Sequence, residues 1–261
     1  MIDIRPVVLV VAMQSELRHL TLPGSGALTA LNGIWPETRF SIGPLPVIAI
    51  RSGIGMVASA AATEHAISHH RPRCVLNFGC AGSHVRDQYP GDVIIGTQSV
   101  AHATVRIDHT GEEVFASNLF TVGQDGQGAN VFASDGELVA LAQEAARDWQ
   151  PAPWPVGDAP RLPEVREGVI GSADVWTQHH PRLDLLHKRH LTLCEDMEAA
   201  AIAQVAGLHN VPFLTIKDIS NNEFLDATDF SDEGAGLLEV EVGRRAAELT
   251  RRLLERLAIR N

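Results

Sequence analysis

The amino-acid sequence predicts an α/β fold in which helices cover the faces of a largely parallel β-sheet. Two observations predict it. Short apolar runs rich in valine recur along the chain, and the first two runs lead through a polar or glycine-containing turn into a segment with helical character. The composition, 261 residues of which 45% are hydrophobic and 20% charged, is that of an ordinary globular protein.

The first half of the chain contains four apolar runs that we interpret as buried strands, at residues 6–12, 46–50, 73–79 and 91–96. Directly after the first run, Met13, Leu17 and Leu20 recur at helical spacing. An alanine-rich helix over 56–70 follows the glycine turn after the second run. This order of strand, turn, helix and strand favours parallel pairing.

The second half continues the same alternation. It predicts an amphipathic helix over 135–149, strands over 166–171 and 212–217, and helices from about Pro181, from Met197 and from about Glu233 to Leu257. The irregular stretches 123–130 and 150–163 are interpreted as loops, because the strand pattern resumes directly after them. We therefore expect one domain over residues 1–261.

Composition excludes several classes of function. The 21 basic and 32 acidic residues give a net charge of −11, which repels a phosphate backbone and argues against a nucleic-acid partner. The apolar run Pro6–Met13 is far shorter than the roughly 18 residues of a membrane span, and no basic segment opens the chain. We expect no membrane partner, a cytoplasmic location and reduced thiols at Cys74, Cys80 and Cys194.

Four strand ends carry unusual polar or small residues, and ligands collect at such ends in open α/β sheets. These are Glu16 after the first strand, 79–82 after the third, 172–176 after the strand over 166–171, and 217–222 at the end of the strand over 212–217. Each is ambiguous alone. Glu16 could be a helix cap, and the Gly-Cys-Ala-Gly turn could serve packing only.

Six segments in order form a more specific pattern: VVAMQSEL, RSGIGMVASAAATEHAI, VLNFGCAGS with GDVIIG, GSADVW, EDMEAAAIA and VPFLTIKDIS. Together they resemble the purine nucleoside phosphorylase and nucleosidase superfamily, most closely its methylthioadenosine/S-adenosylhomocysteine nucleosidase branch. The resemblance implies a single α/β domain on a mixed, partly barrel-like sheet that cleaves the N-glycosidic bond of a purine nucleoside. It also implies a homo-oligomer, most simply a dimer. We expect no cofactor and no metal, because the 12 histidines form no cluster at ligand spacing.

The resemblance also implies roles for individual residues. Glu16 matches the base that activates water, and Glu198 matches the glutamate that accepts from the ribose diol. Trp176 matches the aromatic residue that stacks on the purine, and Thr177 the residue that holds the purine through its backbone. The remaining substrate-binding candidates are Cys80, Ala81, Gly82, Asp196 and Met197. Core packing remains the alternative interpretation for Met197 and for Trp176.

Asn221 departs from the pattern, because this branch normally has there the aspartate that protonates the departing purine. An amide donates and accepts hydrogen bonds but cannot surrender a proton. The substitution predicts slower chemistry on methylthioadenosine or a different base, such as the 6-oxopurine of the related futalosine hydrolases. Asp218, Asn222 and Asp226 are nearby residues that could compensate.

Lys217 and Cys80 are further departures, since the branch has an arginine and a small hydroxyl residue at these positions. Lys217 could pair with Glu16 or Glu198 and keep that carboxylate ionised, or it could be a solvated strand-end lysine. We count it with Glu16 and Asn221 among the catalytic candidates.

Water is favoured over phosphate as the nucleophile, because Asn77 stands where phosphorylases of the superfamily place an arginine. Arg51 and Arg106 keep phosphorolysis open as an alternative. A non-catalytic nucleoside-binding protein is a further alternative, motivated by Asn221 and Cys80. A dinucleotide-binding protein is disfavoured, because the glycines at 53 and 55 do not complete a GxGxxG motif.

Overall fold

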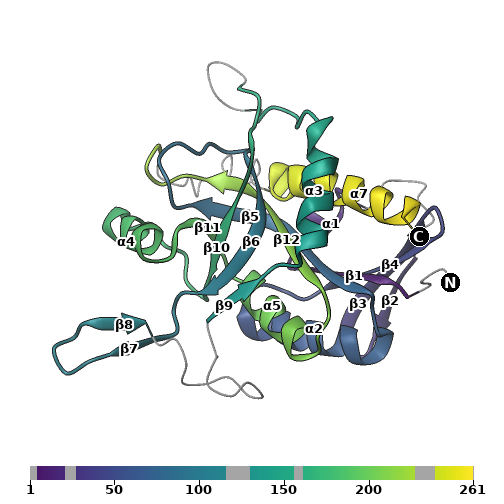
Figure 1. The fold of residues 1–261 in the computed structure, drawn as a ribbon, viewed down its shortest axis with the longest axis horizontal. Helices are drawn as coiled ribbons and strands as arrows, with labels where there is room; N and C mark the ends of the chain where they lie inside the picture. Colours follow the sequence, from purple (N-terminus) through teal and green to yellow (C-terminus); the bar gives the residue numbers. More distant parts are fainter. Residues whose placement is uncertain (1–4, 21–27, 116–129, 156–160, 227–238, 261) are drawn as a thin grey trace.

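The computed structural model describes residues 5–20, 28–115, 130–155, 161–226 and 239–260. Ten strands form one sheet: β1 (Val7–Val11), β2 (Leu28–Asn32), β3 (Trp35–Ile42), β4 (Leu45–Arg51), β5 (Cys74–Ser83), β6 (Val93–Ala101), β9 (Val131–Ala133), β10 (Val165–Ser172), β11 (Thr192–Asp196) and β12 (Phe213–Asn221). A separate hairpin pairs β7 (Val105–Ile107) with β8 (Glu113–Phe115), and it projects away from the sheet (Figure 1).

The main sheet is mixed and partly closed. Its strand order is β11-β10-β6-β12-β5-β1-β4-β3-β2, with β9 beside β6. Parallel pairs join β4, β1, β5 and β12, whereas β12 and β6 pair antiparallel. An antiparallel contact between β11 and β5 closes the path from β11 to β5 into a ring. The mixed, partly barrel-like α/β fold implied by the resemblance is therefore confirmed. The largely parallel sheet predicted from the alternation of strands and helices is wrong, because half of the strand pairings in this sheet are antiparallel.

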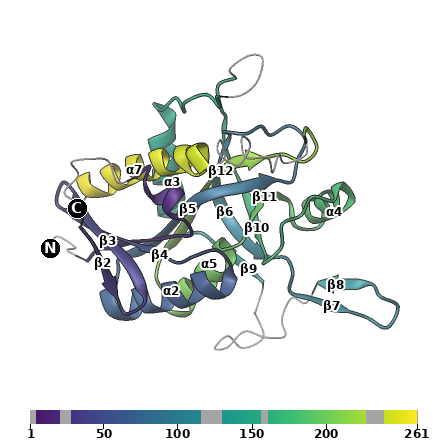
Figure 2. The same ribbon diagram turned by 180° about the vertical axis from the view of Figure 1, so that it is seen from behind.

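Helices cover both faces of the sheet (Figures 1 and 2). The described helices are α1 (Gln14–Leu17), α2 (Met56–His70), α3 (Gly136–Arg147), α4 (His180–His190), α5 (Ala199–Leu208) and α7 (Arg244–Ile259). Helices α2 and α5 pack together on one face, and α3 and α7 pack together on the opposite face. Among the described residues, no helix has both the length and the apolar composition needed to cross a bilayer.

The valine-rich run of β1 lies at the centre of this arrangement. Val7, Leu9 and Val11 belong to the apolar cluster that includes the buried face of α7, while Val8 and Val10 belong to the cluster beneath α2 and α5. Successive side chains of a strand point to opposite faces, so a strand covered on both sides needs apolar residues at every position. This explains the unbroken apolar run in the sequence.

Several elements escaped the sequence analysis or begin elsewhere. Strand β3 contains Pro36 and two charged residues, and β11 is only five residues long, so neither shows an apolar run. The helix predicted from Met197 begins at Ala199. The helix predicted from Glu233 begins at Arg244, because Gly243, at φ 71°, interrupts the helical backbone before it. Residues 233–238 of that prediction, and the loop positions 123–129 and 156–160, lie outside the described residues.

Asn77 is a buried polar link between three strands. Its amide nitrogen donates to the Val10 carbonyl at 2.8 Å, and its amide oxygen accepts from the Thr215 hydroxyl at 2.8 Å. The side chain is 1% exposed, and both of its polar atoms have partners. Asn77 thus ties β1 and β12 to β5 instead of facing a ligand.

We predict that Asn77→Ala lowers the free energy of unfolding by about 2–3 kcal/mol, because it leaves buried partners without hydrogen bonds. Chemical denaturation measures this loss. Thr215→Val removes only one of the two bonds and should cost less. A free energy of unfolding for Asn77→Ala within about 0.5 kcal/mol of wild type would contradict this role.

Candidate active site

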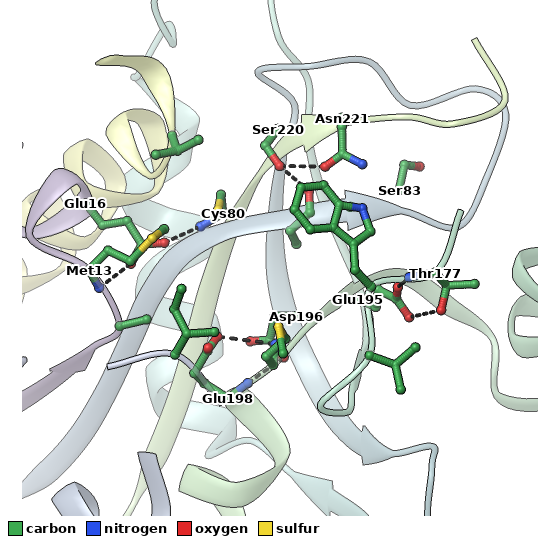
Figure 3. A pocket seen from close by; sticks show the side chains of 18 of the residues that line it. Met13, Glu16, Cys80, Ser83, Thr177, Glu195, Asp196, Glu198, Ser220 and Asn221 are labelled. Atoms are coloured by element: carbon green, nitrogen blue, oxygen red, sulfur yellow. Dashed lines mark hydrogen bonds between the residues drawn. The ribbon is translucent and has the colours of Figure 1, made fainter. Parts of the chain in front are cut away.

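The strand ends at one side of the closed part of the sheet surround a cavity of about 470 Å³. Every site residue predicted from the sequence lines it except Lys217, which lies directly behind two of the lining carboxylates. The structure therefore brings together residues from β5, β11, β12 and the turns that follow β1 and β10 (Figure 3). The further lining residues, none of them named as a site residue from the sequence, are Ala12, Met13, Ser15, Ile54, Ser83, Val175, Leu183, Glu195, Ser220, Glu239 and Val242.

Glu16 is held on the short helix α1 with its carboxylate at the cavity wall. Oε1 accepts from the Cys80 backbone N–H at 2.9 Å and Oε2 from the Met13 backbone N–H at 3.1 Å. The residue is 2% exposed, and this burial raises the pKa of Glu16 above its ordinary value despite the nearby Lys217 charge. A carboxylate with a raised pKa is a stronger base, which suits proton abstraction from water.

The turn before α7 packs directly on Glu16. A side chain at Gly243 would place its Cβ 2.8 Å from the Glu16 Cγ, so only glycine fits there at φ 71°. Asp218 holds this turn by accepting from the Gly243 and Arg245 backbone N–H groups, each at 2.9 Å. Asp218 therefore caps α7 and does not line the cavity, so it does not compensate for Asn221.

Asn222 likewise faces away from the cavity, since its amide nitrogen donates to the Val85 and Gln88 carbonyls.

Lys217 is buried, at 1% exposure, which rules out the alternative of a solvated strand-end lysine. Its Nζ lies 2.7 Å from Asp196 Oδ2 and 3.8 Å from Glu198 Oε2. Asp196 is thus its main partner, where the sequence analysis expected Glu16 or Glu198. Burial alone would lower the pKa of Lys217, but the charges of Asp196, Glu198 and Glu16 raise it above its ordinary value, so the ammonium stays charged.

Asp196 and Glu198 lie at the N-terminus of α5. Asp196 accepts from the Ser172 hydroxyl at 2.5 Å and from the Ala199 backbone N–H at 3.1 Å, and so caps the helix. Glu198 accepts from the Gly55 backbone N–H at 3.0 Å. Burial raises the pKa of Glu198 to about 7, against the opposing charge of Lys217. Glu198 can therefore change its charge near neutral pH.

The part of the cavity predicted to hold the base differs from expectation at Thr177. Its backbone N–H donates to Glu195 Oε1 at 2.6 Å, so the group that the resemblance assigns to the purine is already occupied. Trp176 is 52% exposed and lines the cavity, which excludes the core-packing interpretation. Met197 also lines the cavity and is only half-buried.

The Asn221 amide has a defined orientation. Its oxygen accepts from the Ser220 hydroxyl at 2.8 Å, and its nitrogen donates to Glu223 Oε1 at 2.9 Å. An amide nitrogen carries a second N–H, which remains for a ligand. Gly82 leaves room beside this amide, because a Cβ there would lie 3.3 Å from the Asn221 nitrogen.

Cys80 contributes to the cavity wall through its backbone N–H group more than through its thiol. The Cys80 N–H donates to Glu16, whereas burial and the Glu16 charge raise the pKa of the Cys80 thiol well above its ordinary value. A thiol that keeps its proton is a poor nucleophile. Cys80 is therefore suited to positioning Glu16, and Ala81 and Gly82 continue the same wall.

Acidic side chains dominate the charge of the cavity. The carboxylates among its described lining residues belong to Glu16, Glu195, Asp196, Glu198 and Glu239, and no described lining residue is basic. Arg51 donates to Gln14, Arg106 lies on the projecting hairpin, and Asn77 is in the core. The described residues contain no group of three or more His, Cys, Asp or Glu side chains arranged to hold a metal ion.

We predict that Lys217→Met lowers the free energy of unfolding by about 3–5 kcal/mol near pH 8, because it leaves buried carboxylates without their partner. Without the Lys217 charge the folded-state pKa values of Glu16 and Glu198 rise further, so stability is retained at low pH and lost as pH rises through these pKa values. The loss should be clearly smaller near pH 5. Lys188→Met, at the exposed lysine of α4, is the matched control and should change little at either pH. Equal losses at both pH values would contradict the ion-pair assignment.

Comparison with known proteins identifies the same superfamily that the sequence pattern resembles. The sequence model of the phosphorylase superfamily matches residues 6–258. The 5'-methylthioadenosine/S-adenosylhomocysteine nucleosidase of Shewanella pealeana is 33% identical over 257 residues, which cover 94% of this chain and 97% of that protein.

Solved structures show the same relationship. The 5'-methylthioadenosine/S-adenosylhomocysteine nucleosidase from Neisseria meningitidis, in complex with methylthio-immucillin-A, has a TM-score of 0.74 at 26% identity, with 97% of this chain and 99% of that chain covered. The futalosine hydrolase of Helicobacter pylori has a TM-score of 0.75 at 22% identity, with 97% and 98% covered, and so shares the fold. The resemblance seen in the sequence is confirmed: the chain belongs to the phosphorylase superfamily and, within it, to the family of the 5'-methylthioadenosine/S-adenosylhomocysteine nucleosidases.

Proposed function

We propose that this protein hydrolyses the N-glycosidic bond of 5'-substituted purine nucleosides, with 5'-methylthioadenosine and S-adenosylhomocysteine as its substrates. The observation that carries the proposal is the placement of Glu16 and Glu198 at the wall of one cavity, each buried and each with a raised pKa. The name and activity of the Shewanella pealeana relative support the choice of substrates.

In the proposed reaction, Glu16 takes a proton from a water molecule as the water oxygen attacks the anomeric carbon. The electrons of the C1′–N9 bond pass to the purine, and the sugar acquires oxocarbenium character in the transition state. Glu198 as a carboxylate accepts from the two hydroxyls of the ribose diol, which places negative charge beside the developing positive charge. Asn221 donates to N7 and so stabilises the departing base without protonating it.

Water is the proposed nucleophile because the cavity is acidic. A phosphate dianion would enter among five carboxylates with no basic residue among the described lining residues to bind it. Lys217 lies behind Asp196, with its charge already matched. A neutral water beside Glu16 meets no such repulsion.

A 6-oxopurine nucleoside is the second candidate substrate, and Asn221 is the observation that favours it. A rotated amide can donate to a 6-oxo group and accept from a protonated N7, whereas an ionised aspartate can only accept. Asn221 thus favours a substrate whose purine carries a 6-oxo group.

We also propose that the protein acts as one domain over residues 1–261, in the cytoplasm, as a homodimer, and in methionine salvage. Support for a second copy comes from exposed apolar side chains: Ile54 and Val175, which line the cavity, are 55% and 49% exposed, and Val57, three residues after Ile54, is 80% exposed. Burial of such a patch against a partner would remove it from water.

The proposal is tested by offering the purified protein methylthioadenosine, S-adenosylhomocysteine, inosine, guanosine and futalosine, with and without phosphate, and measuring released base. We expect phosphate-independent release that is fastest for a 5'-substituted nucleoside. Release that requires phosphate would make the protein a phosphorylase, and no release from any nucleoside would contradict the proposal.

We predict that Glu16→Gln lowers kcat by about 10²- to 10⁴-fold, since the amide cannot accept the proton of water. Affinity for methylthioadenosine, measured by calorimetry, should remain close to that of the wild type. This variant also separates the enzyme from a non-catalytic nucleoside-binding protein, because such a protein would have no turnover to lose.

In the Glu16→Gln background, we predict that affinity for methylthioadenosine falls as pH drops through the pKa of Glu198, where Glu198 takes up a proton and can accept only one of the two diol hydrogens. In this variant the pKa of Glu198 should lie below its wild-type value of about 7, because the Glu16 charge that helps to raise it is absent. Calorimetry from about pH 5 to about pH 9 measures this dependence. A 2′,3′-dideoxy nucleoside is the control and should bind independently of pH in this range. The same pH dependence for both ligands would show that Glu198 does not bind the diol.

A further inference from the structure

Glu195 is a buried carboxylate at the base end of the cavity to which the proposed mechanism gives no role. It lies on β11, paired with Gly82 of β5, and it lines the cavity at 7% exposure. Figure 3 shows Glu195 beside Thr177, on the side of the cavity opposite Glu16 and Met13.

The two oxygens of Glu195 have different surroundings. Oε2 accepts from the Thr177 hydroxyl at 3.1 Å and lies 3.2 Å from the Nε2 atoms of both His84 and His102. Oε1 accepts from the Thr177 backbone N–H at 2.6 Å. A carboxylate has about four acceptor positions, so Oε1 keeps capacity for one more donor.

These contacts keep Glu195 charged. Burial alone would raise its pKa, but the interactions with His102, His84 and the Thr177 N–H overcome burial and hold the pKa of Glu195 below its ordinary range. Burial lowers the pKa of His84, so that imidazole stays neutral near neutral pH and does not offset the charge of Glu195. The wall therefore presents an acceptor with a negative charge.

The same contacts remove a donor. The Thr177 N–H is bonded to Glu195, so an incoming ring nitrogen with a lone pair meets a carboxylate in place of a free N–H. Adenine presents such a lone pair at N1, whereas a 6-oxopurine presents an N1–H group. A hydrogen bond to a charged acceptor is about twice as strong as a neutral one, and a lone pair facing the carboxylate is repelled.

We propose that Glu195 is a specificity residue that contacts the N1 edge of the purine and favours bases with an N1–H over bases with an N1 lone pair. This proposal rests on the proposed function, because it assumes that a purine occupies the cavity. The proposal concerns how much Glu195 changes the ratio of kcat/KM between a nucleoside with an N1–H and one with an N1 lone pair. It does not depend on which of the two nucleosides the wild-type protein cleaves faster.

The test uses two nucleosides that differ only in the base, 5'-methylthioinosine and 5'-methylthioadenosine, and compares their kcat/KM values. In Glu195→Gln the charge is lost and an N–H donor is gained, so we expect the inosine-to-adenosine ratio to fall at least about tenfold. Glu37→Gln is the matched control, since Glu37 is also buried and hydrogen-bonded but does not line the cavity. Its ratio should equal that of the wild type. An unchanged ratio in folded Glu195→Gln would overturn the proposal.

A second measurement needs neither a variant nor turnover. Calorimetry gives the affinity of the wild-type protein for adenine and for 1-deazaadenine, in which a C–H group replaces N1. If N1 faces the Glu195 carboxylate, removing its lone pair leaves binding as tight or makes it tighter. If N1 instead accepts from a protein N–H, 1-deazaadenine binds about tenfold more weakly, which would overturn the proposal. Base affinities remain measurable even if no nucleoside is cleaved. Failure of the proposed function can therefore be distinguished from failure of the proposal for Glu195.

Discussion

The buried ammonium of Lys217 is the charge on which the arrangement of the cavity depends. It lies 2.7 Å from Asp196 and 3.8 Å from Glu198, and its charge also acts on Glu16. Carboxylates crowded into one buried site raise one another's pKa and would become neutral without a cation. The Lys217 charge opposes the rise in pKa at Glu16 and at Glu198, although burial still holds both pKa values above their ordinary range.

Strand β12 places this charge and also fixes the helices around the cavity. Lys217 and Asp218 are consecutive, so their side chains point to opposite faces of the sheet. On one face, Lys217 meets Asp196, which caps α5 and so positions Glu198. On the other face, Asp218 caps α7 and seats Gly243 against Glu16. One strand end therefore controls the two carboxylates that carry the proposed chemistry.

Much of the fold could be predicted from the sequence, because a strand covered on both faces must be apolar throughout, as β1 is. Short or polar strands such as β3 and β11 could not, since tertiary pairing holds them. The candidate residues Glu16, Glu198 and Asn221 could be selected because their spacing matched a known pattern. The Lys217–Asp196 pair joins two different strands, and the Glu195–Thr177 contact joins a strand to a loop, so only the folded structure brings these residues together.

The role of Lys217 is tested most directly by a ¹³C nuclear magnetic resonance titration of the Glu198 carboxyl, assigned by comparison with Glu198→Gln, in the wild-type protein and in Lys217→Met. In the wild type we predict a Glu198 pKa of about 7. In Lys217→Met the opposing positive charge is lost, and we predict a clear upward shift of that pKa. A Glu198 pKa that is the same in both proteins would contradict the claim that the Lys217 charge lowers the pKa of this carboxylate.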